Sequence, residues 1–297
     1  MHCDLRRLRK LFEARHSGLM LEAFEGRRRD LTARLRKARK EPSEKRVHSL
    51  RVAARRMLSM LDLLETALPP RGTRKVRRII RKRLGELRLT RDVQVQLGYC
   101  DQLIADFPQL AGFRKSLARQ ERRLRRRVRG KLRSLSPRKL DRRTDKLLDG
   151  LVSALDPDAD TALGRGIHAS LEDSWHRVLL RRARIDPKQT ASIHRMRLAF
   201  KRFRYTAEIA ASCFPQLRRE RLKAMHAYQD RMGAIQDMET LLRSMMEFRR
   251  RSGRTSILVV ENEIRRRRER HIDDFMQAAD EIRFFWSVPQ ADSREVV

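Results

Sequence analysis

Apolar residues recur with helical spacing along nearly the whole chain. The clearest stretch runs from Ser43 to Leu68, where apolar positions alternate steps of four and three: Leu50, Ala54, Met57, Leu61, Leu64 and Leu68. This spacing places all of them on one face of an α-helix, as a seam that faces a core requires. A second stretch carries an equivalent seam, formed by Met196, Phe200, Phe203, Ala207, Ala210 and Phe214. Because β-branched runs are short, the pattern predicts an all-α fold.

The same periodicity predicts four main helices in each half of the chain. The first half, residues 1–155, is expected to hold helices near 4–40 (which Ser17-Gly18 could interrupt), 43–68, 73–106 and 111–133, with a shorter one near 138–155. Residues 156–160 are acidic and contain a proline, which predicts an exposed linker. The second half, 161–288, repeats the plan near 161–184, 188–214, 217–252 and 255–280, and residues 289–297 are expected to be a flexible tail.

One segment occurs twice. Val47 to Met57 and Ile193 to Phe203 both read apolar-His-x-apolar-Arg, followed by a basic pair four and five residues after the arginine. The two histidines are offset by 194 − 48 = 146 positions, and a proline follows each copy at the same offset, at Pro69 and Pro215. The repetition indicates two related halves that place a histidine and several cations at equivalent points.

The duplicated polar side chains fall on one side of each predicted helix. At about 100° per residue, His48, Arg51 and Arg55 lie close together and away from the apolar seam. His194, Arg197 and Lys201 form the equivalent stripe in the second copy. A single arginine-rich stripe is most often a solvated helix face, but its recurrence in register favours a binding site. Asp92 and Asp237 could ligate a metal, although pairing with and orienting an arginine is the favoured interpretation.

Composition indicates what these cations bind. The chain has 72 Lys and Arg against 38 Asp and Glu, a formal net charge of +34, and most of the cations are arginine. Such a charge repels itself unless a polyanion neutralises it, and the planar guanidinium matches phosphate oxygens bidentately. The runs Arg122–Arg127 and Arg265–Arg268 are expected to be partly solvated and partly anion-steering.

Several classes of protein are disfavoured. Cys3, Cys100 and Cys213 are too few and scattered for a disulfide framework or a metal ribbon, which predicts a reducing cytoplasm. No stretch approaches the length of a membrane span, and no phosphate-binding loop or zincin motif appears. Glu261 to Arg265 superficially resembles the Glu-x-Glu-x-Lys element of triphosphate tunnel enzymes, but that element lies on a strand. We therefore expect no catalytic residues, metal or cofactor.

The duplicated motif resembles the CHAD domain, a helical family whose signature is His-x-x-Arg-x-x-x-Arg/Lys-Arg followed by a Leu-Gly…Arg-Asp element. The likeness covers roughly residues 4–280, while Leu58 and Gln236 depart from the pattern. It implies two pseudo-twofold-related four-helix bundles around a basic groove or pore that binds inorganic polyphosphate. The implied contacts are His48, Arg51, Arg55, Arg56, Arg74, Arg78, Arg81, His194, Arg197, Lys201, Arg202, Arg204, Lys223 and His226, with Arg77 in the same row as Arg74 and Asp92, Asp237 and Tyr205 in support.

The function expected from the sequence is non-enzymatic polyphosphate binding in the cytoplasm, with association with polyphosphate granules. Other phosphate or sulfate anions could share the site, and His48 and His194 are expected to strengthen binding in mild acid. The main alternative is sequence-independent binding to the backbone of DNA or RNA, which the sparse aromatic residues disfavour. A phosphate-chain hydrolase is a further alternative, disfavoured because no carboxylate cluster for metal ions is evident.

Overall fold

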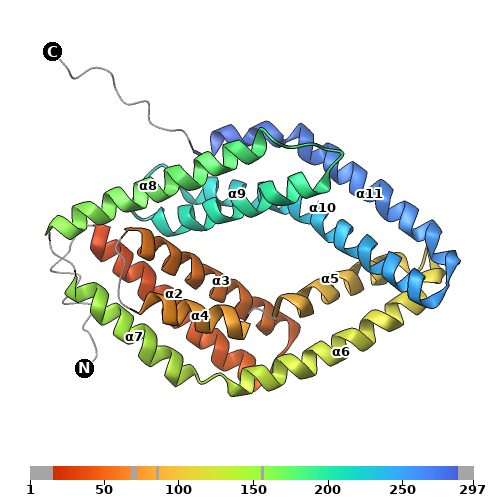
Figure 1. Ribbon diagram of the computed structural model, residues 1–297, viewed down its shortest axis with the longest axis horizontal. Helices are drawn as coiled ribbons and strands as arrows, with labels where there is room; N and C mark the ends of the chain where they lie inside the picture. The colour runs from red at the N-terminus through yellow and green to blue at the C-terminus, as the bar shows by residue number, and fades with distance from the viewer. Residues whose placement is uncertain (1–15, 68–71, 85–86, 155–156, 287–297) are drawn as a thin grey trace, which may run out of the picture. The chain divides into compact units, whose positions relative to one another are not determined.

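The computed structural model describes residues 16–67, 72–84, 87–154 and 157–286, and within these ranges it contains helices and no strand (Figure 1). The α-helices are α2 (His16–Lys40), α3 (Glu44–Ala67), α4 (Thr73–Leu84), α5 (Leu87–Leu103), α6 (Ala111–Ser134), α7 (Pro137–Ser153), α8 (Pro157–Arg182), α9 (Thr190–Ala210), α10 (Arg219–Ser252) and α11 (Leu258–Gln277). Three short 3-10 helices are η1 (Pro108–Leu110), η2 (Thr255–Ile257) and η3 (Ala279–Phe284). The predicted all-α fold is confirmed.

Three segments differ from the predicted boundaries. The helix expected over 73–106 is described as α4 and α5, with residues 85–86 outside the described ranges, and α5 ends at Leu103. The helix expected over 4–40 runs without interruption from His16, so Ser17-Gly18 does not break it, and its residues 4–15 lie outside the described ranges. Pro157 to Asp160, expected in a linker, form the first turn of α8, where proline fits without losing a hydrogen bond and acidic side chains favour the helix dipole.

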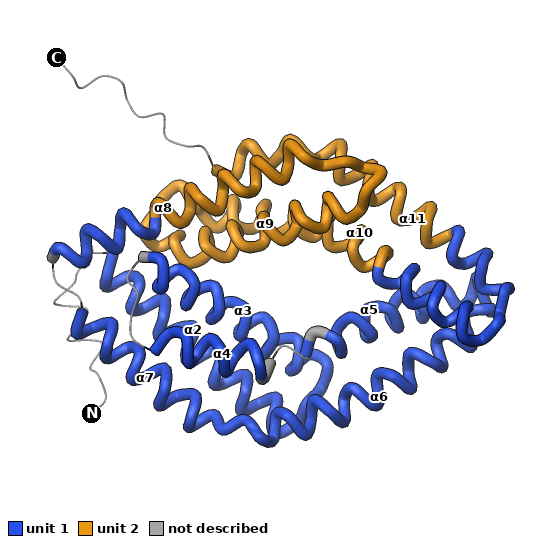
Figure 2. The backbone as a smooth tube through the Cα atoms, viewed as in Figure 1, with its two compact units in different colours: residues 1–167, 240–262 blue, residues 168–239, 263–297 orange. Residues whose placement is uncertain are grey.

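The chain divides into two compact units (Figure 2). Unit 1 comprises residues 1–167 and 240–262, and unit 2 comprises residues 168–239 and 263–297. The predicted halves, divided at 156–160, follow the sequence repeat, whereas each compact unit combines segments from both halves. The division falls inside α8, α10 and α11, and the predicted tail from 289 lies outside the described residues.

Unit 1 is built on the pairing of α2 with α3, with α4 and α5 packed on α3 and with α6 and α7 on α2 (Figure 1). The predicted seam of α3 is buried as expected: Leu50, Met57 and Leu61 are each 0% exposed. Leu68, the last residue of that seam, lies outside the described residues. The long helix α10 ends in this unit because Gly253 adopts a φ of +68°, and its N–H donates to the Arg249 carbonyl at 2.9 Å.

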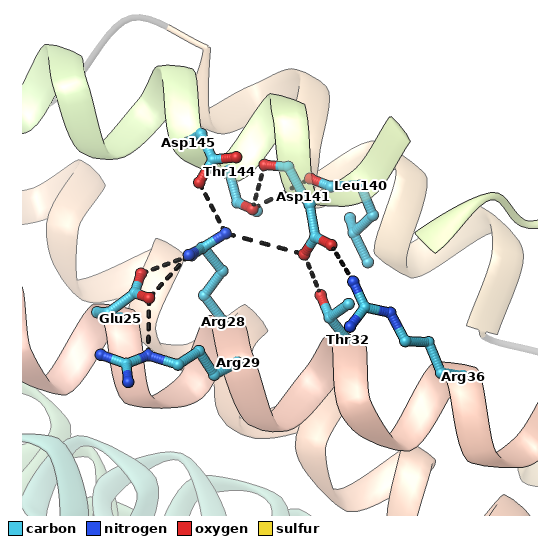
Figure 3. Close-up of polar contacts among 9 residues, drawn as sticks. All are labelled: Glu25, Arg28, Arg29, Thr32, Arg36, Leu140, Asp141, Thr144 and Asp145. Carbon is cyan, nitrogen blue, oxygen red and sulfur yellow. Dashed lines mark hydrogen bonds and ion pairs between the residues drawn. The ribbon is translucent and has the colours of Figure 1, made fainter. Parts of the chain in front are cut away.

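A network of charged groups joins α2 to α7 (Figure 3). The Arg28 guanidinium donates to both carboxylate oxygens of Glu25 and lies 2.7 Å from Asp145 on α7. The Thr32 hydroxyl donates to Asp141 at 2.6 Å, and Arg36 donates to the same carboxylate at 2.9 Å. Burial alone would raise the pKa of Glu25, but hydrogen bonds and charge from Arg28 and Arg29 hold that pKa below its ordinary value. These cations therefore stabilise the helix pair.

Unit 2 has an aromatic core, to which α9 contributes its predicted seam. The Phe200 ring lies 4.9 Å from Tyr228 of α10, and the Phe203 ring lies 4.8 Å from Trp175 of α8. The Tyr228 hydroxyl donates to the Ala279 carbonyl at 3.0 Å, which satisfies the one polar atom of that buried ring. These contacts fix the face of α9 that is buried, and hence the face on which His194 and Arg197 project.

Candidate anion-binding site

The first copy of the duplicated motif lies on α3 in unit 1. The helix begins after Ser43, whose hydroxyl accepts a hydrogen bond from the Arg46 N–H at 3.4 Å. Because the seam is buried on the other side, His48 is exposed, while Arg51 and Arg55 are half-buried, and Arg56 is exposed beside them. Arg55 makes no hydrogen bond or ion pair with another described residue. The predicted stripe is therefore present on one accessible face of α3.

The positive charge of this stripe affects the pKa of His48. Although much of the His48 side chain is exposed, its ring is partly shielded from water. This desolvation first, and then the positive charges of Arg51, Arg91 and Arg55, hold the pKa of His48 below its ordinary value, while Glu44 acts in the opposite direction. The neutral imidazole is thus favoured, first by its partial burial and then by the cations on the same surface. An anion bound there would reverse this effect and favour the protonated ring.

Arg91 also contributes positive charge to the stripe on α3, although the sequence indicated it only as the arginine of the Arg-Asp element. It lies on α5, which packs on α3, and its charge reaches His48. The aligned position in the second repeat is Gln236 on α10. The signal was present in the sequence, since the Arg-Asp element follows the His motif, but only the packing of α5 on α3 brings the two together.

The cations predicted on α4 differ in how accessible they are: some are exposed, and one is held in ion pairs with α3. Arg78 is exposed and has no partner among the described residues, and Arg74 is 92% exposed, 3.6 Å from Glu65. Arg81 is exposed and 3.7 Å from Asp62. Arg77, which we expected in the same row, is instead held by Asp62 and Glu65 of α3 and donates to the Leu61 carbonyl. Its role is to hold α4 on α3.

The second copy lies on α9 in unit 2. His194, Arg197 and Lys201 are half-buried on one face, and Arg202 is exposed. Gly233 of α10 faces the guanidinium of Arg197, because a Cβ added at Gly233 would lie 3.8 Å from both Nε and one terminal nitrogen. The sequence did not single out this glycine, whose lack of a side chain leaves space beside Arg197.

Arg204 is not an accessible contact, which corrects the sequence prediction. Its side chain is buried, donates to Gln229 at 3.1 Å and pairs with Glu208 one turn later. Its guanidinium carbon also lies 4.5 Å from the centre of the buried Tyr205 ring. The helical repeat does place Arg204 in line with Arg197, but the end of α9 is covered by α10, and so Arg204 and Tyr205 belong to the core of unit 2.

The residues of α10 that were predicted to flank the stripe on α9 differ in whether an acidic partner lies beside them. Lys223 is exposed, as predicted. His226 is exposed too, but its Nδ1 lies 2.8 Å from Asp230, a carboxylate that would compete with a bound anion. Asp92, expected to orient an arginine, makes no ion pair or hydrogen bond with another described residue, and Asp237 is half-buried on α10. The support expected from Asp92 is therefore not found.

The remaining features concern metal binding, membrane insertion and thiol chemistry. Within the described residues, no three His, Cys, Asp or Glu side chains lie close enough together to hold a metal ion. None of the described helices combines the length and apolar character needed to cross a bilayer. Burial raises the pKa of the Cys100 thiol to about 12, which keeps this thiol protonated and unreactive.

Comparisons with known proteins agree with the all-α fold. The family model described as the CHAD domain matches residues 22–245. The fold is similar to the crystal structure of the CHAD domain from the plant Ricinus communis, with a TM-score of 0.69 and 20% identity over 92% of this chain and 91% of that chain. It is also similar to PptA from Streptomyces chartreusis, with a TM-score of 0.61 and 16% identity over 91% of this chain and 99% of that chain. A search of curated proteins finds no match.

Proposed function

The chain belongs to the CHAD domain family, and from that premise we propose that it binds inorganic polyphosphate, without chemical turnover, through the stripes on α3 and α9. The observation that carries the proposal is the duplicated arrangement itself. In each copy a histidine and two cations lie on the face of the helix that the buried seam leaves accessible: His48, Arg51 and Arg55 in one, His194, Arg197 and Lys201 in the other.

The partly buried position of these cations suits a thin phosphate chain. Arg51 and Arg197 occupy equivalent positions, and both are half-buried, so each guanidinium meets an anion where water screens the attraction less than at a fully exposed site. Charge-assisted bonds from arginine to phosphate are among the stronger hydrogen bonds in proteins. A chain that carries about one negative charge per phosphate and no bases can approach several such groups at once.

A binding role is proposed in preference to hydrolysis because of the kind of side chain involved. Enzymes that cleave phosphate chains commonly hold metal ions on clustered carboxylates, whereas the two stripes present cations and imidazoles. In a cell, such binding would associate the protein with polyphosphate granules in the cytoplasm. Other phosphate or sulfate anions would share the site weakly, because short ligands reach fewer cations.

Calorimetric titration with long-chain polyphosphate tests the proposal. The variant Arg51→Gln/Arg197→Gln removes the equivalent arginine from each stripe. Its matched control, Arg142→Gln/Arg143→Gln, removes two exposed arginines from α7. We expect the stripe variant to weaken binding by about 1–3 kcal/mol, and the control to change it much less.

A DNA duplex at the same phosphate concentration separates the proposal from its main alternative. Preference for polyphosphate, lost in the stripe variant, would support the stripes as the site. Equal affinity for both polymers, with the stripe variant and the control weakened alike, would mean that the net charge of +34 alone attracts polyanions and that the motif is structural.

A further inference from the structure

The outward face of α6, in unit 1, carries a continuous row of cations that is separate from the stripes. Its members alternate steps of four and three residues, and all six are exposed: Lys115, Arg119, Arg122, Arg126, Arg129 and Arg133. They lie opposite the buried face of the helix, which is formed by Phe113, Leu117, Val128 and Leu132. From Lys115 to Arg133 this row, here called the α6 ridge, extends about 27 Å at about 1.5 Å per residue.

The α6 ridge lacks the carboxylates that accompany the other arginine-rich helices. None of its six side chains forms an ion pair with a described residue, and the one acidic residue of α6, Glu121, lies to the side of the row. By contrast, Glu263 of α11 lies within 4 Å of Arg266, Arg267 and Arg270. The Arg122–Arg127 and Arg265–Arg268 runs look alike in sequence, but Arg266, Arg267 and Arg268 form ion pairs with glutamates, whereas Arg122 and Arg126 of the α6 ridge form none with a described residue.

This arrangement is unfavourable for an isolated solvated helix. Like charges three and four residues apart repel one another along the whole row, and an acidic residue at any of these positions would relieve the repulsion. The ridge also borders two hollows, one lined by Arg122, Arg125, Arg126 and Arg129 and the other by Ser116, Arg119, Arg122, Arg123 and Arg126. All four residues that line the first hollow are arginines, as are four of the five that line the second, so a group held in either hollow lies close to several positive charges.

The shape of the ridge distinguishes among polyanions. A straight row on one helix follows the backbone of a nucleic-acid duplex only briefly, because that backbone winds away around the duplex axis. No aromatic side chain lies on the exposed face of α6 to stack with the bases of a single strand. A flexible chain of phosphates without bases can instead lie along the ridge and meet each cation in turn.

We propose that the α6 ridge is a second polyphosphate-binding surface, used in addition to the stripes on α3 and α9. The identity of the ligand rests on the proposed function, but the surface itself shares no residue with the stripes. Two surfaces on one molecule allow it to engage two stretches of a long chain, or two chains, so that binding becomes multivalent. Long polyphosphate should then bridge protein molecules, and short polyphosphate should not.

The test compares binding to long-chain polyphosphate at 50 and 200 mM salt. The ridge variant is Arg119→Gln/Arg122→Gln/Arg126→Gln/Arg129→Gln. Its control, Arg138→Gln/Lys139→Gln/Arg142→Gln/Arg143→Gln, removes four exposed cations from α7 in the same unit. At about 0.7 counterions released per contact, four contacts change the salt slope by about 3, so the wild type should lose about 50-fold more affinity over this range than the ridge variant. The control should keep nearly the wild-type slope, and light scattering should show that only the ridge variant has lost bridging.

The same measurements on Arg51→Gln/Arg197→Gln, alone and combined with the ridge variant, separate the two proposals. Loss of slope on ridge substitution in both backgrounds supports the ridge, whether or not the stripe substitutions matter. A ridge variant that matches the α7 control in slope and in bridging overturns the ridge, whatever the stripes do. If the ridge substitutions weaken binding to a DNA duplex more than to polyphosphate at equal phosphate concentration, the assignment of the ligand is wrong.

Discussion

Replacing Arg204 should destabilise unit 2 without removing a polyphosphate contact. The substitution Arg204→Met keeps much of the side-chain volume but removes the guanidinium of a residue that is only 3% exposed. Glu208 and the buried Gln229 would then lose a charged hydrogen-bond donor, and the contact over the Tyr205 ring would be lost. A charged hydrogen bond contributes about 1.5–3 kcal/mol, and an ion pair broken on one side in a protein interior costs about 3–5 kcal/mol. Because Glu208 retains some contact with water, we expect a loss of about 3 kcal/mol.

Tryptophan fluorescence during guanidinium unfolding provides the assay. The chain has two tryptophans, Trp175 and Trp286, and both are buried in unit 2, so their signal reports the unit in which Arg204 lies. The matched control is Arg202→Met, which removes an exposed cation two residues away on the same helix. We expect the control to unfold like the wild type and to bind polyphosphate more weakly. Arg204→Met should behave in the opposite way.

A second substitution examines the cause of the loss. Arg204→Met/Glu208→Gln also removes the carboxylate that had lost its Arg204 donor, so part of the lost stability should return. If Arg204→Met unfolds at the same denaturant concentration as the wild type but binds polyphosphate less tightly, the structural role argued for Arg204 is wrong and its position on the stripe is the important one.

Three further predictions concern pH and packing. The pKa of His48 is lowered in the free protein, so a bound polyanion should raise it. Binding should therefore take up protons and tighten as pH falls from about 7.5 to about 5.5. Calorimetry in two buffers should show that this proton uptake is reduced in His48→Ala but not in His176→Ala, which changes an exposed histidine of α8. Gly233→Ala should leave polyphosphate affinity unchanged, because its Cβ only touches Arg197, whereas Gly233→Leu should displace that guanidinium and lower the affinity. Glu25→Gln should cost about 1–2 kcal/mol near pH 7; since the pKa of Glu25 is lowered on folding, its contribution is present above about pH 4.5 and should vanish in acid melts.

Helical periodicity predicted the buried faces of α3 and α9. The seam residues that lie within these two helices are buried, because one period governs both secondary structure and the buried face, whereas Phe214, placed in the second seam, lies beyond the end of α9 and is only partly buried. Periodicity could not predict that Gln229 would cover Arg204, or that Asp62 would hold Arg77, since both partners are set by how helices pack. The Asp230 partner of His226 was within reach, because a four-residue spacing on one helix brings such pairs together.

The inequality of Arg91 and Gln236 has a consequence for how the repeat has diverged. Inorganic polyphosphate has chemically identical ends and an identical repeating unit, so it has no direction for a protein to read. A receptor for such a polymer needs enough cations in total, but it does not need the two descendants of a duplication to remain alike. Loss of one cation from one copy is then compensated by any other cation that the polyphosphate can reach. A ligand with two chemically different ends would instead have fixed the identity of the residue at each position.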